Sequence, residues 1–129
     1  MIVVDASLIC DFLLNAEANP DLVAFLSIQD GIAAPGHITY EVGNVIRKHY
    51  LAGKVTGQRG LEALESFINL PIDLHEATAI VQVAWRYRDN LSFYDASYVA
   101  LAETLGVALY TRDKRLQNAP RLRAEIVIV

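Results

Sequence analysis

Five short apolar segments, separated by stretches with helical periodicity, constrain this chain more than any other feature of its sequence. The segments cover residues 2–5, 32–34, 71–74, 107–111 and 126–129. Nearly continuous apolar runs are typical of strands buried on both faces, and strands that alternate with helices form parallel sheets. We therefore expect an α/β fold, a single three-layer α/β/α domain over residues 1–129 with a short, mainly parallel five-stranded sheet.

Periodicity and capping residues predict the helices between these strands. Asn19 and Pro20 indicate a helix start, because Asn is favoured at the N-cap and Pro at the first helical position. Gly53 and Gly106 are expected to end two helices, since glycine readily adopts the left-handed conformation found there. The helices expected on this basis are 7–14, 20–30, 39–52, 56–69, 76–90 and 93–105, with one short turn over 114–118.

Composition excludes several classes of protein. The chain has 11 Lys and Arg against 15 Asp and Glu, a formal net charge of −4, and 53% hydrophobic residues. It is therefore neither disordered nor uniformly basic. No apolar run approaches the ~20 residues of a membrane span, and the first residues lack the features of a secretion signal. The one cysteine, Cys10, can form no internal disulfide, so we expect a protein of the reducing cytoplasm without a membrane association.

Four acidic residues stand at the ends of predicted elements. Asp5 ends the first strand, Glu41 lies in the first turn of a helix, Asp95 opens another helix and Asp113 follows the fourth strand. Helix starts and strand ends meet at the carboxyl edge of a parallel sheet, where open α/β sheets bind ligands. Each residue singly also suits a structural role: Asp5 and Asp113 as N-caps, Asp95 in a capping box with Ser92, and Glu41 beside a helix dipole.

Electrostatics favours a cation at this predicted cluster. Two carboxylates ~4 Å apart repel by about 4 kcal/mol at an effective dielectric constant near 20, so either their pKa values rise or a cation lies among them. Oxygen donors without nearby Cys or His favour Mg²⁺ or Mn²⁺. Ser7, Asn44 and Thr111 are candidate supporting polar residues, with a helix cap, an exposed polar residue and a strand end as their structural alternatives. No histidine is placed as a general base, and His37 is expected to be a loop or capping residue.

The segments around these residues resemble the four motifs of the PIN-domain nucleases. They are Val3-Val4-Asp5-Ala6-Ser7, Glu41-Val42-Gly43-Asn44, Ser92-Phe93-Tyr94-Asp95 and Thr111-Arg112-Asp113, in the family's order across essentially the whole chain. The resemblance implies a PIN-like fold, with Asp5, Glu41, Asp95 and Asp113 as catalytic residues that bind one or two Mg²⁺ or Mn²⁺ ions. It also implies hydrolysis of RNA phosphodiester bonds, with Ser7, Asn44 and Thr111 at the family's secondary polar positions.

With its short single-domain length, the chain most resembles the VapC toxins of toxin–antitoxin pairs. That resemblance implies an RNA substrate, a cognate antitoxin protein and a homodimer. Two alternatives remain open at this point, a PIN nuclease that processes RNA without being a toxin, and a non-catalytic RNA- or protein-binding module on the same fold.

Basic residues concentrate near the C-terminus in spite of the negative net charge. Five of the 11 Lys and Arg fall within twelve residues, at 112, 114, 115, 121 and 123. Phosphate contacts by such residues produce salt-dependent RNA affinity. We predict that Arg112, Lys114 and Arg115, next to Asp113, contribute to RNA binding, with a solvated surface run as the alternative.

Overall fold

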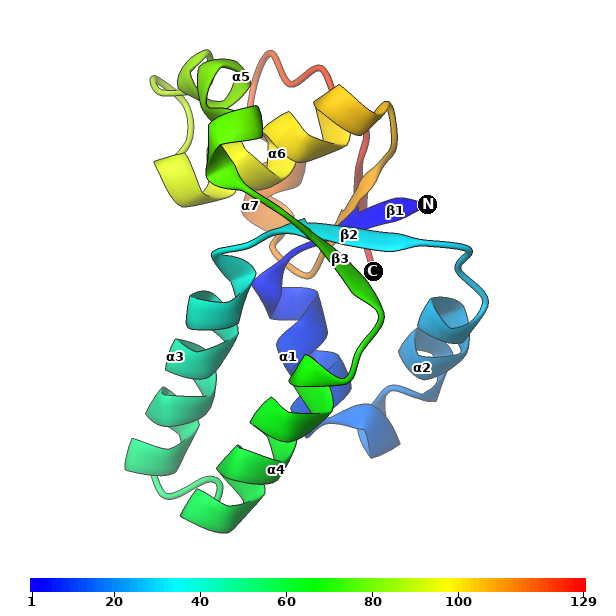
Figure 1. Ribbon diagram of the computed structural model, residues 1–129, viewed down its shortest axis with the longest axis vertical. Coiled ribbons are helices and arrows are strands. Elements are labelled where there is room, and N and C mark those ends of the chain that lie inside the picture. Colours follow the sequence, from blue (N-terminus) through cyan, green and yellow to red (C-terminus); the bar gives the residue numbers. More distant parts are fainter.

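The computed structural model describes residues 1–129 and contains one five-stranded sheet in which every strand pair is parallel (Figure 1). The strand order is β3-β2-β1-β4-β5. The strands are β1 (Ile2–Val4), β2 (Ile32–Pro35), β3 (Ile72–His75), β4 (Leu109–Thr111) and β5 (Ile126–Ile128). The expected α/β class and the five strands are confirmed, and the sheet is parallel throughout rather than only mainly so.

Helices cover both faces of this sheet. Figure 1 shows α1, α2, α3 and α4 on one side and α5 and α6 on the other, with α3 and α4 extending away from the sheet as an antiparallel pair. No helix combines the length and the apolar character that a membrane span requires. The helices are α1 (Ala6–Leu14), α2 (Pro20–Ser27), α3 (Ile38–Leu51), α4 (Gly57–Ile68), α5 (Val81–Trp85), α6 (Phe93–Leu105) and α7 (Lys114–Gln117), with 3₁₀ turns at Ala16–Ala18 and Ala77–Ala79.

The central helix of the core is α6. Its residues Ala96 through Ala102 are buried in an unbroken run, because the helix packs across β1, β2 and β4 while α5 covers its outer side. Small side chains make this close packing feasible, since Ala33 and Ala34 of β2 are fully buried. Gly106 follows with a φ of 68°, the left-handed conformation expected where a helix ends.

The strand order creates a crevice between β1 and β4. From β1 the chain proceeds to β2 and β3 on one side, whereas β4 and β5 lie on the other side of β1. The connections that leave the carboxyl ends of β1 and β4 therefore diverge, which is the geometry of a topological switch point. Asp5, which follows β1, and Asp113, which follows β4, lie at this switch point and belong to the candidate site.

Two local predictions are wrong. The helix expected over 76–90 is only the 3₁₀ turn and α5, followed by turns, although its buried residues Ile80, Ala84 and Tyr87 keep the helical i, i+4, i+7 spacing. The α2 helix begins at Pro20 as expected, but the Asn19 side chain forms no cap hydrogen bond. Asn19 instead donates to the carbonyl oxygen of Asn15 and accepts from Arg112, so two stronger contacts take its amide away from the helix start.

Candidate active site

Four carboxylates lie at the carboxyl edge of the sheet. Asp5 directly follows β1 and is the N-cap of α1, and Asp113 follows β4 and is the N-cap of α7. Glu41 and Asp95 lie in the first turns of α3 and α6. Their charges act on one another, because Asp113 raises the pKa of both Asp5 and Asp95, and Glu41 raises that of Asp95. The structure thus gives each residue the capping or first-turn role expected of it singly, and also gathers all four into one electrostatic cluster.

Asp5 is the most buried and most firmly held member. The residue is 7% exposed, and its Oδ1 accepts from the Ser7 hydroxyl at 2.7 Å and from the Leu8 backbone N–H at 3.1 Å. The Thr111 hydroxyl donates to Oδ2. Burial raises the pKa of Asp5 above its ordinary value, the hydrogen bonds from Thr111 and Ser7 oppose that rise, and the charge of Asp113 adds to it. A carboxylate held by three donors is fixed in orientation before any ligand arrives.

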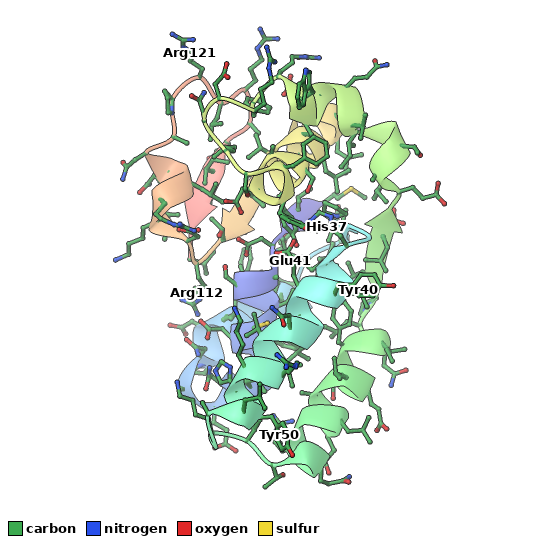
Figure 2. The ribbon with its side chains drawn as sticks, turned by 90° about the vertical axis from the view of Figure 1, so that its left-hand side faces the viewer. His37, Tyr40, Glu41, Tyr50, Arg112 and Arg121 are labelled. Carbon is green, nitrogen blue, oxygen red and sulfur yellow. The ribbon has the colours of Figure 1, made fainter.

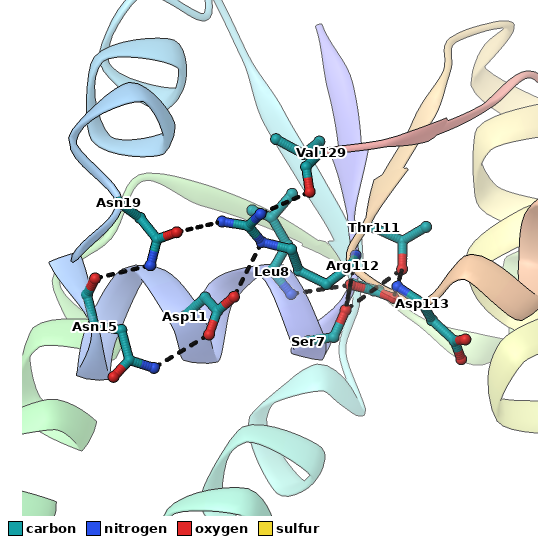
Figure 3. Close-up of polar contacts among 10 residues, drawn as sticks. Ser7, Leu8, Asp11, Asn15, Asn19, Thr111, Arg112, Asp113 and Val129 are labelled. Carbon is teal, nitrogen blue, oxygen red and sulfur yellow. Dashed lines mark hydrogen bonds and ion pairs between the residues drawn. The ribbon is translucent and has the colours of Figure 1, made fainter.

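Ser7 and Thr111 connect the two strands at the crevice. Besides its bond to Asp5, Ser7 Oγ accepts from the Arg112 backbone N–H at 3.1 Å. Thr111 Oγ1 accepts from the Asp113 backbone N–H at 2.9 Å, which places Asp113 relative to Asp5 (Figure 3). Thr111 is fully buried and Ser7 is partly buried, and their two hydroxyls couple the positions of the acidic residues.

Asp113 and Asp95 have opposite electrostatic environments. Arg115 binds Asp113 through its backbone N–H and its guanidinium, with a shortest distance of 2.7 Å, and these contacts hold the pKa of Asp113 below its ordinary value. The Asp95 carboxylate forms no ion pair with an arginine. Its backbone N–H donates to the Ser92 hydroxyl at 3.1 Å. Burial raises the pKa of Asp95, and the charge of Asp113 raises it further.

Glu41 is held by two residues that the sequence did not point to. The Nε2 atom of His37 lies 2.8 Å from its Oε1 (Figure 2). The Tyr98 hydroxyl donates to the same oxygen at 3.2 Å. His37 also lies 3.2 Å from the hydroxyl of Ser97; it occupies the turn and the N-cap position of α3 as expected, but its side chain forms no cap hydrogen bond and contacts Glu41 instead. Residue spacing could have indicated both contacts. His37 stands four residues before Glu41 and Tyr98 stands three after Asp95, and residues at these spacings share a helix face.

A hollow of about 590 Å³ opens beside Glu41. Its walls are His37, Tyr40, Glu41, Asn44 and Tyr94. Tyr40 is 82% exposed and Asn44 makes no side-chain hydrogen bond, so both are open to a ligand. Of the three candidate supporting polar residues, Ser7 and Thr111 therefore orient carboxylates, whereas Asn44 faces accessible space.

The structure assigns different roles to the three cationic residues predicted to bind RNA. The guanidinium of Arg112 points into the protein, where it contacts Asp11 at 3.0 Å, Asn19 at 2.9 Å and the carbonyl oxygen of Val129 at 2.6 Å (Figure 3). This geometry favours a structural role for Arg112, because its guanidinium faces protein acceptors, and its RNA-binding role stays a prediction. Arg115 is exposed but paired with Asp113, and Lys114 is exposed with no ion pair.

Comparison with known proteins agrees with this geometry. The family model described as "PIN domain" matches residues 2–122. The chain is 34% identical over 128 residues to Ribonuclease VapC1 of Mycobacterium tuberculosis, covering 98% of this chain and 96% of that protein.

Two solved structures share the fold. PAE2754 from Pyrobaculum aerophilum superposes with a TM-score of 0.69 at 24% identity, covering 97% of this chain and 81% of the other. VapBC2 from Rickettsia felis, solved bound to a DNA fragment from its promoter, gives a TM-score of 0.67 at 12% identity and covers 98% of both chains. The sequence match, the parallel sheet and the acidic crevice agree, and the chain belongs to the PIN-domain family, among its VapC ribonucleases.

Proposed function

We propose that this chain is a metal-dependent endoribonuclease that hydrolyses RNA phosphodiester bonds and acts as the toxin of a toxin–antitoxin pair. The observation that carries the proposal is the gathering of Asp5, Glu41, Asp95 and Asp113 at the β1–β4 switch point, with one of them buried and held by three donors. The full-length similarity to a protein named as a ribonuclease supports it.

The donor chemistry of the cluster fits a hard divalent cation. No three Asp, Glu, His or Cys side chains are placed closely enough to hold one ion together. The four candidate ligands are nonetheless all carboxylates, and burial together with mutual repulsion raises the pKa values of Asp5 and Asp95, a cost that a bound cation offsets. We assign Mg²⁺ as the ion, with Mn²⁺ able to substitute, because both prefer oxygen ligands. A divalent cation held there supplies positive charge to the phosphodiester and makes water a better nucleophile near neutral pH.

The chain's own residues prepare the site in distinct ways. Ser7 and Thr111 keep the Asp5 carboxylate fixed, so that part of the site is ordered in advance. His37 contacts Glu41 at 2.8 Å, and Arg115 holds Asp113 through an ion pair at 2.7 Å. A cation held by Glu41 and Asp113 would compete with these contacts for the carboxylate oxygens. Asn44 and the exposed Tyr40 border the hollow in which RNA would meet Glu41.

The similarity to VapC ribonucleases also suggests the partners of this chain. An RNA substrate and a cognate antitoxin protein are supported by the VapC relatives. A homodimer is supported by the exposed Trp85 and Phe93, which with Val81 border an apolar hollow that a second copy of the chain would cover. A cytoplasmic location fits the single cysteine, which is buried and free.

The decisive experiment maps new 5′ ends in total cellular RNA treated with the purified chain. We expect cuts at a few sites with Mg²⁺ or Mn²⁺, none with EDTA, and none with Asp95→Asn. Glu65→Gln is the matched control, since Glu65 is exposed on α4 and lies outside the cluster.

Metal binding is measured separately from cleavage. Mn²⁺ should raise the unfolding temperature of the unmodified chain and of Glu65→Gln, and raise that of Asp95→Asn much less. Equal cleavage by Asp95→Asn and the control would show that the acidic cluster is not the active site. Loss of cleavage with unchanged Mn²⁺ stabilisation would remove Asp95 from the metal ligands.

A further inference from the structure

Three arginines surround a cavity that the proposed chemistry does not use. The cavity has a volume of about 520 Å³ and lies between the segment after α5 and the loop before β5. Arg86 borders it from one side and Arg121 and Arg123 from the other, together with Tyr87 and Asn90. Figure 2 shows Arg121 at the end of the molecule opposite Tyr50, projecting away from the protein.

The charge in this cavity is positive and largely uncompensated. The guanidinium groups of Arg121 and Arg123 make no ion pair and no hydrogen bond within the chain, whereas Arg86 pairs with Glu103 at 3.2 Å. Asp89 is the one acidic residue in the lining. In a chain of net charge −4, such a concentration of free cationic donors in a hollow is suited to an anion.

Contacts with neighbouring segments hold the cavity in shape. The Tyr87 hydroxyl donates to Glu103 and accepts from the Arg123 backbone N–H at 3.3 Å. These bonds hold the loop before β5, which carries Arg121 and Arg123, against the segment after α5. The Asn90 side chain donates to the carbonyl oxygen of Pro120 at 3.3 Å. Arg121 has a φ of 63°, a conformation that costs a non-glycine residue energy and that the surrounding contacts must maintain.

A second hollow lies beside this cavity and includes Asp95 of the acidic cluster in its lining. It has a volume of about 540 Å³ and is bordered by Asn90 at one end and by Asp95 and Arg115 at the other. Because Asn90 borders both hollows, they are neighbours on the surface that leads from the arginines to Asp95. A strand of RNA with one phosphate at the carboxylates could therefore extend along this surface and place a later phosphate among the arginines.

We propose that Arg121 and Arg123, together with Arg86, bind a backbone phosphate of single-stranded RNA, away from the bond that is cut. This inference rests on the proposed ribonuclease function and adds a docking site to it. Guanidinium groups suit the role because they pair with phosphate oxygens through two parallel hydrogen bonds. The contact is to the backbone, so it strengthens binding of any sequence and positions the strand without reading bases.

The test is RNA binding without cleavage. A fluorescein-labelled single strand of about 12 nucleotides is titrated in EDTA over a range of KCl concentrations, with anisotropy as the readout. The variant is Arg121→Asn with Arg123→Gln, because Asn tolerates the left-handed conformation at position 121. The control is Arg47→Gln with Lys54→Gln, which removes the same charge from exposed residues of α3 and the turn after it.

The expected result is a selective loss in the arginine variant. Losing this one phosphate contact should lower the magnitude of the salt slope by about 0.7 for a single strand. Affinity at low salt should fall at least about 10-fold, while the control keeps its slope and stays within about 2-fold. Urea unfolding should give both variants the midpoint of the unmodified chain, which excludes loss of fold as the cause.

Two outcomes would overturn the proposal. One is an arginine variant with the same slope and affinity as the control. The other is a loss of affinity for polyglutamate with RNA affinity retained, which would make the cavity a site for an acidic protein segment.

Cleavage kinetics separate this proposal from the ribonuclease function. With Mg²⁺, the arginine variant should show a raised KM and an unchanged kcat. If the unmodified chain cuts no RNA with either metal, the ribonuclease function fails, and the binding series in EDTA still decides whether the arginines hold RNA. If it cuts RNA and the variant has the same KM and salt slope, only the docking site is refuted.

Discussion

Replacing Arg112 by methionine tests whether this residue holds the fold together or binds substrate. Methionine keeps most of the length and apolar volume of the side chain but removes every donor. In the structure these donors connect α1 through Asp11, the start of α2 through Asn19, and Val129 beyond β5. The substitution therefore cuts three contacts between segments that are far apart in the sequence.

The magnitude follows from the number and burial of these contacts. A hydrogen bond to a charged group contributes about 1.5–3 kcal/mol when buried. The side chains of Arg112 and Asp11 are 27% and 36% exposed, so water screens the ion pair and reduces the total. We expect the free energy of unfolding to fall by about 2–3 kcal/mol. With an unfolding entropy of about 2.1 cal/mol/K for each of the 129 residues, Tm should fall by roughly 7–11 °C.

The assay is urea unfolding followed by circular dichroism, with Arg47→Met as the matched control on the exposed face of α3. The control should change stability by less than about 0.5 kcal/mol. A double-mutant cycle with Asp11→Asn should give a coupling energy of about 1 kcal/mol. If Arg112→Met unfolds like the control but binds single-stranded RNA at least about 5-fold more weakly, the structural role assigned to Arg112 is refuted and the residue contacts RNA.

Three further predictions concern single buried or strained positions. Thr111→Val removes the hydroxyl that links Asp5 to Asp113, so we expect unfolding free energy to fall by about 1–3 kcal/mol and cleavage to fall with metal affinity, both measured against the unmodified chain. Gly106→Ala should cost about 1 kcal/mol in urea unfolding because of its φ of 68°, with cleavage unchanged, and a neutral result would refute the strain. Burial raises the pKa of the Cys10 thiol to about 12, so the folded state resists its ionisation while the unfolded chain ionises near 9.0. Stability from this thiol is thus complete below pH 9.0 and is lost as the pH rises toward 12, and Cys10→Ala should flatten that fall in a pH series of unfolding curves.

The sequence was informative about the elements because their determinants are local. Apolar runs identified all five strands, and Gly106 ended α6 where expected. The exception is residues 76–90, whose periodicity suggested one helix although only a few of its side chains are buried. A short helix depends on packing more than on propensity, and packing is not visible in a single sequence. The sequence also could not predict which strands pair, since the β1–β4 pair joins residues more than one hundred positions apart.

The four acidic positions were predictable by themselves, because strand ends and first helical turns of a parallel sheet share one edge. Their burial and their hydrogen-bond and ion-pair partners were not predictable. The tertiary structure buries Asp5 against Thr111, pairs Glu41 with His37, and clamps Asp113 with Arg115. It also divides one basic stretch of sequence, directing Arg112 into the protein and Arg121 outward, and only three-dimensional packing decides which charges meet an acceptor and which stay free. The sequence by itself determined which groups the site has, since residue type and local element are written along the chain, and the tertiary structure decided their burial and partners, since these depend on contacts between distant segments.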